Sequence, residues 1–194
     1  MLYTDIISSP VGNLHLVSNG SVLTHLWLEG QKYVAKIVND DKQEHGQPVL
    51  ETQKPIGENQ LPIFVQAREW LQRYFAGENP GVLPPLSPQG TDFQQAVWRL
   101  LQQIPYGTTT TYSALARQLA RQRGMKTISA QAVGGAIGRN PLCIFIPCHR
   151  VVGTNGSLTG YVGGIKRKRQ LLEIEHIDLS PFFVPKDSTS PSTI

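Results

Sequence analysis

Short apolar runs separated by turn residues occupy the first thirty positions of the chain. The runs cover Leu2–Ile7, Asn13–Ser18 and Ser21–Leu28, and Asn19-Gly20 lies within the break between the last two. An Asn-Gly pair between such runs is typical of a β-hairpin, because both residues tolerate the positive φ that a tight turn needs. We therefore expect a small sheet here, followed by a long polar loop over residues 39–60.

Apolar positions recur at helical spacing through much of the rest of the chain. Helices are expected over residues 64–75, 93–104, 112–121, 129–138 and 165–177. Thr91 and Gln94 match a capping box at the start of the second of these. Between the last two helices, Leu142–Ile146 is a continuous apolar run, which we interpret as a strand. The pattern predicts an α/β (α+β) protein with its sheet first and most of its helices after it.

A proline-rich stretch divides the chain into two parts. Residues 84–90 contain three prolines and a glycine, and they read as a linker between a sheet-plus-helix domain at 1–83 and a second domain at 91–179. The tail, 180–194, is rich in proline, serine and threonine and is expected to be disordered. At 194 residues the chain is long enough for one large or two small domains.

The charge of the chain is mildly basic and unevenly placed. The formal net charge is +4 and the pI is near 9.2. Lys166–Arg169 form one basic block, whereas the acidic residues lie mainly in the first half. Such a block is either a solvated helix start or an electrostatic footprint for phosphates, so charge permits a nucleic-acid partner without requiring one.

The two cysteines, Cys143 and Cys148, are five positions apart. In an extended run their Cα atoms would lie roughly 16 Å apart, at about 3.3 Å per residue, with the side chains on opposite faces. A direct bridge would need the segment to fold back on itself. There is no signal peptide, bilayer-length apolar run or disulfide framework, so we expect a cytoplasmic protein that does not associate with membranes.

Cys148 and His149 place a nucleophile beside a base at the end of the apolar run. A cysteine reacts as its thiolate and therefore needs a base or positive neighbours. Successive residues of a strand point to opposite faces, so His149 would act across a bend or through a bridging water. A neutral histidine base also needs an orienting group, for which Glu173 and Glu175 are the candidates. A Cys-His dipeptide can equally be an inert buried cysteine next to an incidental histidine. No second Cys/His pair has a metal-ligand spacing, which argues against a metal site.

The segment beginning at Ser129 is rich in alanine and glycine for a helix. Gly134 and Gly135 cost about 1 kcal/mol each relative to alanine. Two interpretations remain open: tight packing against another helix, or close approach to a bulky surface such as a duplex groove.

Several motifs together resemble one known family. They are, in chain order, Thr91-Asp92-Phe93-Gln94 with Val97-Trp98, Ile104-Pro105-Tyr106-Gly107, Thr111-Tyr112, Ala132-Val133-Gly134-Gly135-Ala136, Asn140-Pro141, Pro147-Cys148-His149-Arg150-Val151 and Gly163-Gly164. Their order and approximate spacing are similar to those of the O6-alkylguanine-DNA alkyltransferases, the methylated-DNA–protein-cysteine methyltransferases. The resemblance covers residues 1–177, strongly after Gly90 and loosely before it.

This resemblance implies a fold and a reaction. The fold is an N-terminal ribonuclease-H-like domain and a C-terminal winged-helix-like helix-turn-helix domain. The reaction is an irreversible, single-turnover transfer of an alkyl group from O6-alkylguanine, and also O4-alkylthymine, to Cys148. The partner is double-stranded DNA bound through its minor groove, and no cofactor, metal or membrane is expected. The protein is expected to act as a monomer.

The resemblance also assigns roles to residues of the reactive centre. His149 would deprotonate Cys148 through a water, Glu175 would orient His149, and Tyr112 would donate a hydrogen bond to the base. Asn140 would brace the turn before the reactive segment. Further residues would line or support the base pocket: Val151, Tyr161 and Lys168.

A second group would contact DNA, and one member departs from the family. The group comprises Ser129, Gln131, Ala132, Gly134, Gly135 and Thr154. Many relatives carry an arginine where this chain has Gln131, to fill the gap that the flipped base leaves. Because glutamine brings no charge, we expect weaker or slower base flipping. The connection over 122–127 is also long for the family.

Two other functions use the same residue types. A helix-turn-helix protein could bind the lesion without chemistry, and a Cys-His-Glu hydrolase would turn over. Stoichiometry separates them from an alkyltransferase, because a thioether is not hydrolysed and each molecule acts once.

Overall fold

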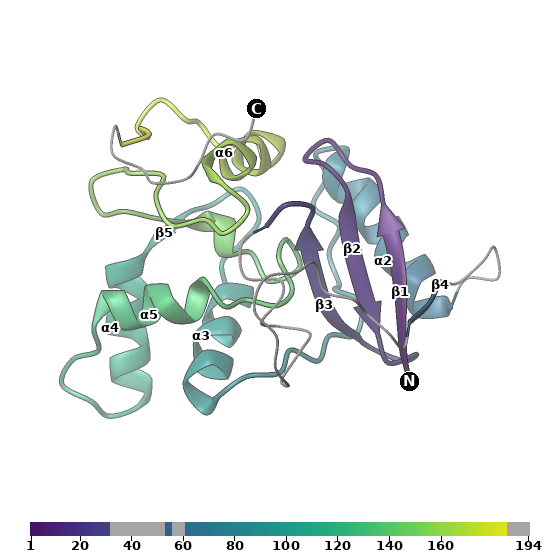
Figure 1. Ribbon diagram of the computed structural model, residues 1–194. Coiled ribbons are helices and arrows are strands. Elements are labelled where there is room, and N and C mark those ends of the chain that lie inside the picture. The colour runs from purple at the N-terminus through teal and green to yellow at the C-terminus, as the bar shows by residue number, and fades with distance from the viewer. Residues whose placement is uncertain (32–52, 56–60, 186–194) are drawn as a thin grey trace.

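The computed structural model describes residues 1–31, 53–55 and 61–185 (Figure 1). Its main sheet contains β1 (Leu2–Ile7), β2 (Leu14–Ser18), β3 (Leu23–Leu28) and β4 (Gln53–Pro55), in the order β3-β2-β1-β4. Strand β2 pairs antiparallel with both β1 and β3, as the predicted hairpin requires for β2 and β3, and β4 runs parallel to β1. The expected loop over 39–60 lies mostly outside the described residues, and its described part, β4, is a strand.

The hairpin predicted at Asn19-Gly20 is present, with a four-residue loop. Ser18 pairs with Leu23, so β3 begins two residues later than the apolar pattern indicated. Gly20 has a φ of 108°, and the Asn19 side chain accepts hydrogen bonds from the backbone N–H groups of Ser21 and Val22. The asparagine side chain thus supplies part of the hydrogen bonding that a tighter turn would take from the backbone.

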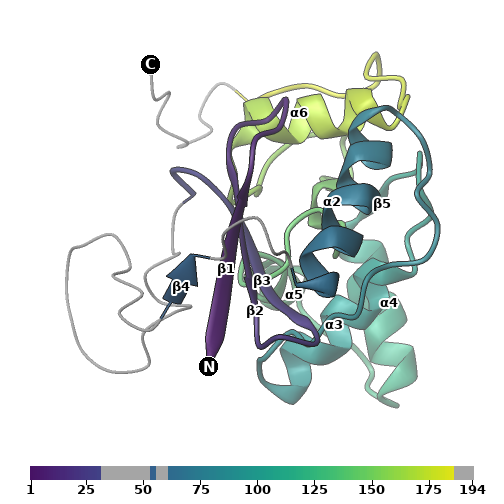
Figure 2. The ribbon, with the colours of Figure 1, turned by 90° about the vertical axis from the view of Figure 1, so that its right-hand side faces the viewer.

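Helix α2 (Pro62–Phe75) covers one face of the sheet (Figure 2). Proline at the first helical position has no N–H to leave unpaired there. The apolar stripe of α2 includes Phe64, Trp70 and Tyr74, all buried. The helix therefore closes the core of the N-terminal half and brings Tyr74 toward the other half.

The C-terminal half is mainly helical and lies beside the sheet (Figure 1). It contains α3 (Asp92–Gln102), α4 (Tyr112–Gln122), α5 (Ala130–Ile137) and α6 (Ile165–Ile174), and the short parallel strands β5 (Thr110–Thr111) and β6 (Val151–Val152). Both hydrogen bonds of the predicted capping box form, between Thr91 and Gln94 at 2.8 and 3.3 Å. Helices α4 and α5 pack on each other and on α3.

The apolar run Leu142–Ile146 is not a strand, contrary to the sequence prediction. It makes a single bridge to Leu26 of β3 and then turns back, with Ile144 at a φ of 72°. The Asn140 side chain accepts from the N–H of Leu142 at 3.0 Å and donates to the carbonyl of Ile146 at 2.8 Å. The run is apolar because it is buried between the two halves, and an asparagine side chain replaces the ladder that a strand would supply.

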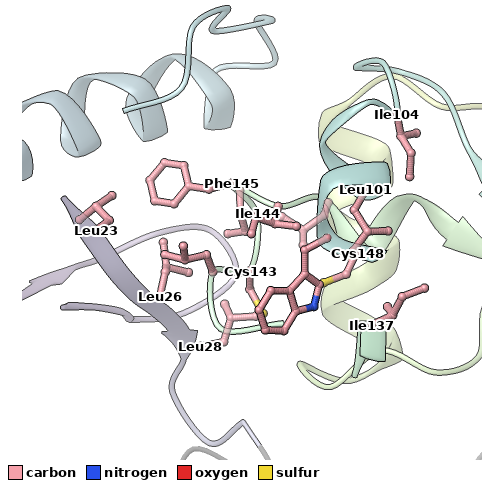
Figure 3. Packing of buried hydrophobic residues seen from close by; sticks show 14 of the residues in the cluster. Leu23, Leu26, Leu28, Leu101, Ile104, Ile137, Cys143, Ile144, Phe145 and Cys148 are labelled. Carbon is pink, nitrogen blue, oxygen red and sulfur yellow. The ribbon is translucent and has the colours of Figure 1, made fainter. Parts of the chain in front are cut away.

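One hydrophobic cluster runs through both halves of the protein. It joins Leu16 and Phe64 of the N-terminal half to Trp98, Leu101 and Phe145 of the C-terminal half. Figure 3 shows this cluster around the folded-back segment, with Cys143 and Cys148 among its members. The reactive segment is therefore held by the core of the whole molecule.

Part of the segment expected to be disordered is ordered. Phe183 donates its N–H to Gly156 and accepts from Leu158 at 3.0 and 2.9 Å, and Phe182 packs on a small cluster that contains Leu172. Phe182 and Phe183 give this stretch apolar surface, although its composition is otherwise rich in proline, serine and threonine. No helix among the described residues is long and apolar enough to cross a membrane.

Candidate active site

Cys148 begins a single 3-10 turn, Cys148–Arg150, between Pro147 and β6. Pro147, with φ −79° and ψ 65°, bends the chain into this turn. The cysteine is only 4% exposed, and His149 is fully buried. Because the backbone turns here, the strand rule that separates adjacent side chains does not apply, and the bend expected from the sequence is present.

Glu175 holds His149 in place. Nε2 of His149 lies 2.6 Å from Oε1 of Glu175, which is the C-cap of α6. Glu173, the other candidate, forms an exposed ion pair with Arg169 at 3.0 Å. Nδ1 of His149 is buried and has no hydrogen-bond partner among the described residues.

Two further side chains fix Glu175, and sequence reasoning did not assign them. Tyr74 of α2 donates its hydroxyl to Oε1 at 2.8 Å and lies 3.2 Å from Nε2 of His149. Arg150 donates to both carboxylate oxygens, at 2.8 and 3.0 Å. The N–H of Gly107 completes the set at 3.2 Å. A place on an apolar helical stripe was the only signal for Tyr74, and Gly107 stood in a quoted motif without a role toward Glu175.

These contacts determine the protonation of the pair. Burial raises the pKa of Glu175, but hydrogen bonds and charges from His149 and Arg150 outweigh it and lower that pKa to about 2. Burial lowers the pKa of His149, although Glu175 opposes the shift. A charged Glu175 accepts the Nε2 proton of a neutral imidazole, so Nδ1 keeps the free lone pair that a general base needs.

Cys148 is surrounded by groups that favour its thiolate. A hydrogen bond from Cys143 lowers the pKa of Cys148 most, and the Asn140 amide and the Lys168 charge add to this against the opposing effect of burial. Lys168 has no exposed surface and donates to the carbonyls of Val151 and Thr159 at 2.5 and 2.9 Å. Burial lowers the pKa of Lys168 to about 8, while Cys148 works against this shift. The thiolate thus has both a donor and a nearby cation.

The residues expected to form a base pocket lie around Cys148. Tyr112, at the start of α4, donates to the carbonyl of Thr159 at 3.1 Å. Burial raises the pKa of Tyr112 to about 12, and the charge of Cys148 adds to the shift. Burial also raises the pKa of Tyr161, whose hydroxyl has no partner among the described residues. Val151 is fully buried in the same cluster as Cys148.

The residues expected to contact DNA lie mainly on α5 and its cap. Ser129 caps the helix by accepting from the N–H of Gln131 at 3.2 Å, and the side chains of Gln131 and Ala132 are exposed. Thr154 is exposed in the turn after β6.

The space around the glycines of α5 tests whether tight packing inside the protein explains them. A methyl group on Gly134 would lie 3.6 Å from Tyr112, an ordinary contact distance, and one on Gly135 would lie 3.4 Å from the flexible end of Arg139. Packing inside the protein therefore does not require glycine at Gly134. Close approach to an external surface stays a prediction for this helix.

Both halves of the chain match families of known proteins. Residues 2–81 match "6-O-methylguanine DNA methyltransferase, ribonuclease-like domain", and residues 92–177 match "6-O-methylguanine DNA methyltransferase, DNA binding domain". Among the described residues, no group of three or more His, Cys, Asp or Glu side chains is placed to hold a metal ion.

Curated proteins and solved structures are similar over nearly the whole chain. Methylated-DNA–protein-cysteine methyltransferases from Haemophilus influenzae and Mycobacterium bovis are 38% and 42% identical, over 91% and 90% of this chain and 87% and 93% of theirs. The crystal structure of Mycobacterium tuberculosis OGT in complex with DNA has a TM-score of 0.72 and 39% identity, covering 93% of this chain and 94% of that one. A structure of Mycobacterium tuberculosis O6-methylguanine methyltransferase gives a TM-score of 0.71 at 42% identity, over 90% of this chain and 93% of the other.

Proposed function

This chain belongs to the O6-methylguanine DNA methyltransferase family, and from that premise we propose which of its residues perform the reaction. It is a DNA-repair enzyme that transfers a methyl group from O6-methylguanine to a cysteine of its own. The acceptor is Cys148. The observation that carries this assignment is the buried arrangement at the 3-10 turn, where neutral His149 is held by charged Glu175 beside a thiol of lowered pKa. The pKa of the other thiol, Cys143, is raised, first by its hydrogen bond with Cys148 and then by burial.

The reaction is a displacement at the methyl carbon. The thiol proton passes through water to Nδ1 of His149. The Cys148 thiolate forms a bond to the methyl carbon while the carbon–oxygen bond to O6 breaks. The electron pair of that bond goes to guanine, which takes up a proton from water and leaves as a neutral base, and this balances the thiol proton accepted by His149. Tyr112 donates a hydrogen bond to the base as charge develops on it.

The product explains why each molecule acts once. A thioether on Cys148 has no leaving group that water displaces readily, so the cysteine is not regenerated. The same attack also applies to O4-alkylthymine, because that base carries an alkyl–oxygen bond of the same kind that can enter the same pocket. Because the reaction consumes a free thiolate, we place the protein in the reducing cytoplasm, where thiols stay reduced.

The DNA partner is a duplex held at the face of α5. The minor groove is only about 6 Å wide, and the small residues of this helix, including Gly134 and Gly135, are what fits there. The target nucleotide rotates out of the stack into the pocket at Cys148, at a cost of a few kcal/mol that a damaged pair reduces. Residues 91–179 supply these contacts, and residues 84–90 link them to residues 1–83. The first 83 residues support the site through Tyr74. The protein acts as a monomer.

Intact-protein mass spectrometry tests this function. The protein is mixed with an excess of duplex DNA that contains one O6-methylguanine. We expect a mass gain of one methyl group that saturates at one per protein, and no gain in Cys148→Ser. A protein that holds the DNA but gains no mass would be a lesion binder, and methyl loss from DNA beyond one per protein would indicate a hydrolase.

A further inference from the structure

The two cysteines lie much closer together than their spacing in an extended chain allows. The left-handed backbone at Ile144, with its φ of 72°, and the hydrogen bond from the N–H of Ile146 to the carbonyl of Leu142 at 2.9 Å reverse the chain between them. The 3-10 turn then carries Cys148 back toward Cys143. Both side chains belong to the same buried cluster, at 1% and 4% exposure, and Figure 3 shows them within it.

Other contacts occupy the Cys143 thiol only weakly. Its sulfur lies 3.7 Å from Oε1 of Gln31 and 3.9 Å from the carbonyl of Asn140. Oε1 of Gln31 already accepts from the backbone N–H of Leu28 at 3.1 Å. The S–H of Cys143 can therefore rotate away from Gln31 without leaving that side-chain oxygen unpaired.

The interaction between the two neighbouring thiols separates their acidities. It is the largest influence on each: it lowers the pKa of Cys148 and raises the pKa of Cys143. Burial raises the pKa of both thiols, so desolvation alone would leave each of them protonated. Both shifts favour Cys148 as the anion and Cys143 as the donor.

We propose that Cys143 is a positioning residue that donates its S–H to the Cys148 thiolate and so stabilises the nucleophile. The proposal rests on the assignment of Cys148 as the methyl acceptor. Cys143 acts with the Asn140 amide and the Lys168 ammonium, and neither of these lies on the folded-back turn itself. Its contribution depends on a donor at this position, which a serine also provides and an alanine does not.

The test measures how readily Cys148 ionises in three proteins. The wild type, Cys143→Ala and Cys143→Ser are treated with iodoacetamide without DNA over a range of pH, and alkylation of Cys148 is followed by mass spectrometry. Single-turnover methyl transfer from duplex O6-methylguanine is measured over the same range. We expect Cys143→Ala to shift both profiles to higher pH, by about one unit, with a roughly tenfold slower reaction near pH 7. Cys143→Ser should remain close to the wild type.

Two results would overturn the proposal. One is a Cys143→Ala profile that coincides with the wild type, and the other is an equal shift in both variants, which would indicate lost packing rather than a lost donor. Thermal unfolding of each variant accompanies the profiles. A wild type that is alkylated by iodoacetamide at Cys148 but takes no methyl from DNA would instead contradict the proposed function.

A separate observation concerns the connection between α4 and α5. A groove with a volume of about 380 Å³ lies between them. Three cations line it, Arg117 and Arg121 of α4 and Lys126 of the connection, and all three are exposed. The remaining lining is small, apolar or uncharged: Ser113, Ala116, Ala120, Met125, Thr127, Ile128 and Ala130. We call this feature the basic groove.

The charges of the basic groove are not balanced within the described structure. None of its three cations has an ion pair or side-chain hydrogen bond to another described residue, whereas neighbouring Arg123 donates to the carbonyl of Asp92 at 3.0 Å. The sequence contains no aspartate or glutamate between Asp92 and Glu173. An anionic partner would therefore be attracted by all three cations of the basic groove.

We infer that the basic groove holds the sugar-phosphate backbone of the bound DNA, next to the stretch contacted by α5. This inference rests on the proposed DNA partner. It assigns a role to the long connection over 122–127, which places Lys126 in the same groove as Arg117 and Arg121. The contacts would be to phosphates and would add affinity without reading sequence.

The salt dependence of DNA binding tests this inference. Each neutralised phosphate contributes about 0.9 to the slope of log affinity against log salt. The triple variant Arg117→Gln, Arg121→Gln, Lys126→Gln should lower that slope by about 2 to 3 and leave reaction of Cys148 with iodoacetamide unchanged. Arg73→Gln on α2, which pairs with Glu78, is the control and should leave the slope unchanged.

An unchanged slope in the triple variant would overturn the assignment, as would the same loss per charge in the control. Wild-type protein that does not bind duplex DNA at all would contradict the proposed partner rather than the groove alone.

Discussion

Glu175 keeps its negative charge inside the protein because donors from three parts of the chain converge on its two oxygens. They come from His149 and Arg150 at the 3-10 turn, from the Gly107 backbone and from Tyr74 of α2. The charge of this carboxylate fixes the imidazole tautomer, and the tautomer directs Nδ1 as the base. At the scale of single residues, the orientation of His149 is therefore set by groups that do not touch the substrate.

Removing the Tyr74 hydroxyl should slow methyl transfer. A hydrogen bond to a charged group contributes about 1.5–3 kcal/mol, and loss of the lower value from the positioning of His149 corresponds to about a tenfold slower step. Single-turnover rates for Tyr74→Phe, with DNA affinity measured separately, check this. Tyr106→Phe is the matched control, since its hydroxyl donates to the carbonyl of Ile174 at 3.1 Å and not to Glu175. Equal losses in the two variants would mean that Tyr74 acts only through packing.

We expect Gln131 to limit base flipping, because it cannot add a positive charge to the space that the flipped base leaves in the duplex. Its side chain is exposed on α5. We expect Gln131→Arg to speed repair of O6-methylguanine in duplex DNA and to leave reaction with the free alkylated base unchanged. Parallel rate measurements on the two substrates decide this. A change in both rates would remove Gln131 from the flipping step.

At the scale of elements, α5 and the folded-back segment after it show what an apolar or small-residue pattern can and cannot specify. The composition of α5 indicated either tight packing or an external surface. The space around Gly134 then shows that packing on Tyr112 does not require glycine at that position. The run Leu142–Ile146 looked like a strand because burial between two halves gives the same apolar pattern as burial in a sheet. Its turn depends on the Asn140 side chain, a long-range detail that periodicity does not carry.

Gly134→Ala should therefore raise the free energy of unfolding of the protein and lower its affinity for duplex DNA. Alanine gains up to about 1 kcal/mol over glycine in a helix interior, and its methyl group meets Tyr112 at 3.6 Å, an ordinary contact. In the groove, the same methyl would occupy space that DNA needs. Urea unfolding and duplex affinity measure the two effects. An unchanged affinity would mean that this face of α5 does not enter the groove.

At the scale of the whole molecule, the N-terminal half is part of the active site rather than a detached support. The core cluster crosses between the halves, and Tyr74 reaches the His149–Glu175 pair directly. The sequence was sufficient for the fold class, the first three strands and the capping box, and it singled out Cys148 and His149 as the residues for which we propose the chemistry. It was not sufficient for Tyr74, Gly107 or the proximity of Cys143, because each depends on how distant segments meet.

The charge of Glu175 should make the stability of the whole protein depend on pH. Its pKa in the folded protein is about 2, below the ordinary 4.5. The associated stability is present above about 4.5 and is lost as the pH falls toward 2, and it is on the order of 3 kcal/mol. Glu175→Gln should be less stable than the wild type at pH 7, with the difference shrinking through this window. Urea unfolding from pH 7 to pH 2 measures it, and a difference that does not vary with pH would contradict this account.

The central claim is that Cys148, and not Cys143, receives the methyl group. Both cysteines lie on one tryptic peptide, because no lysine or arginine separates them between Arg139 and Arg150. The protein should therefore react with duplex DNA carrying an isotopically labelled O6-methylguanine, and the peptide should be fragmented to locate the label. We predict the label on Cys148 alone, at one methyl per protein. A label on Cys143, or an unlabelled peptide from protein that has cleared the lesion, would contradict the account.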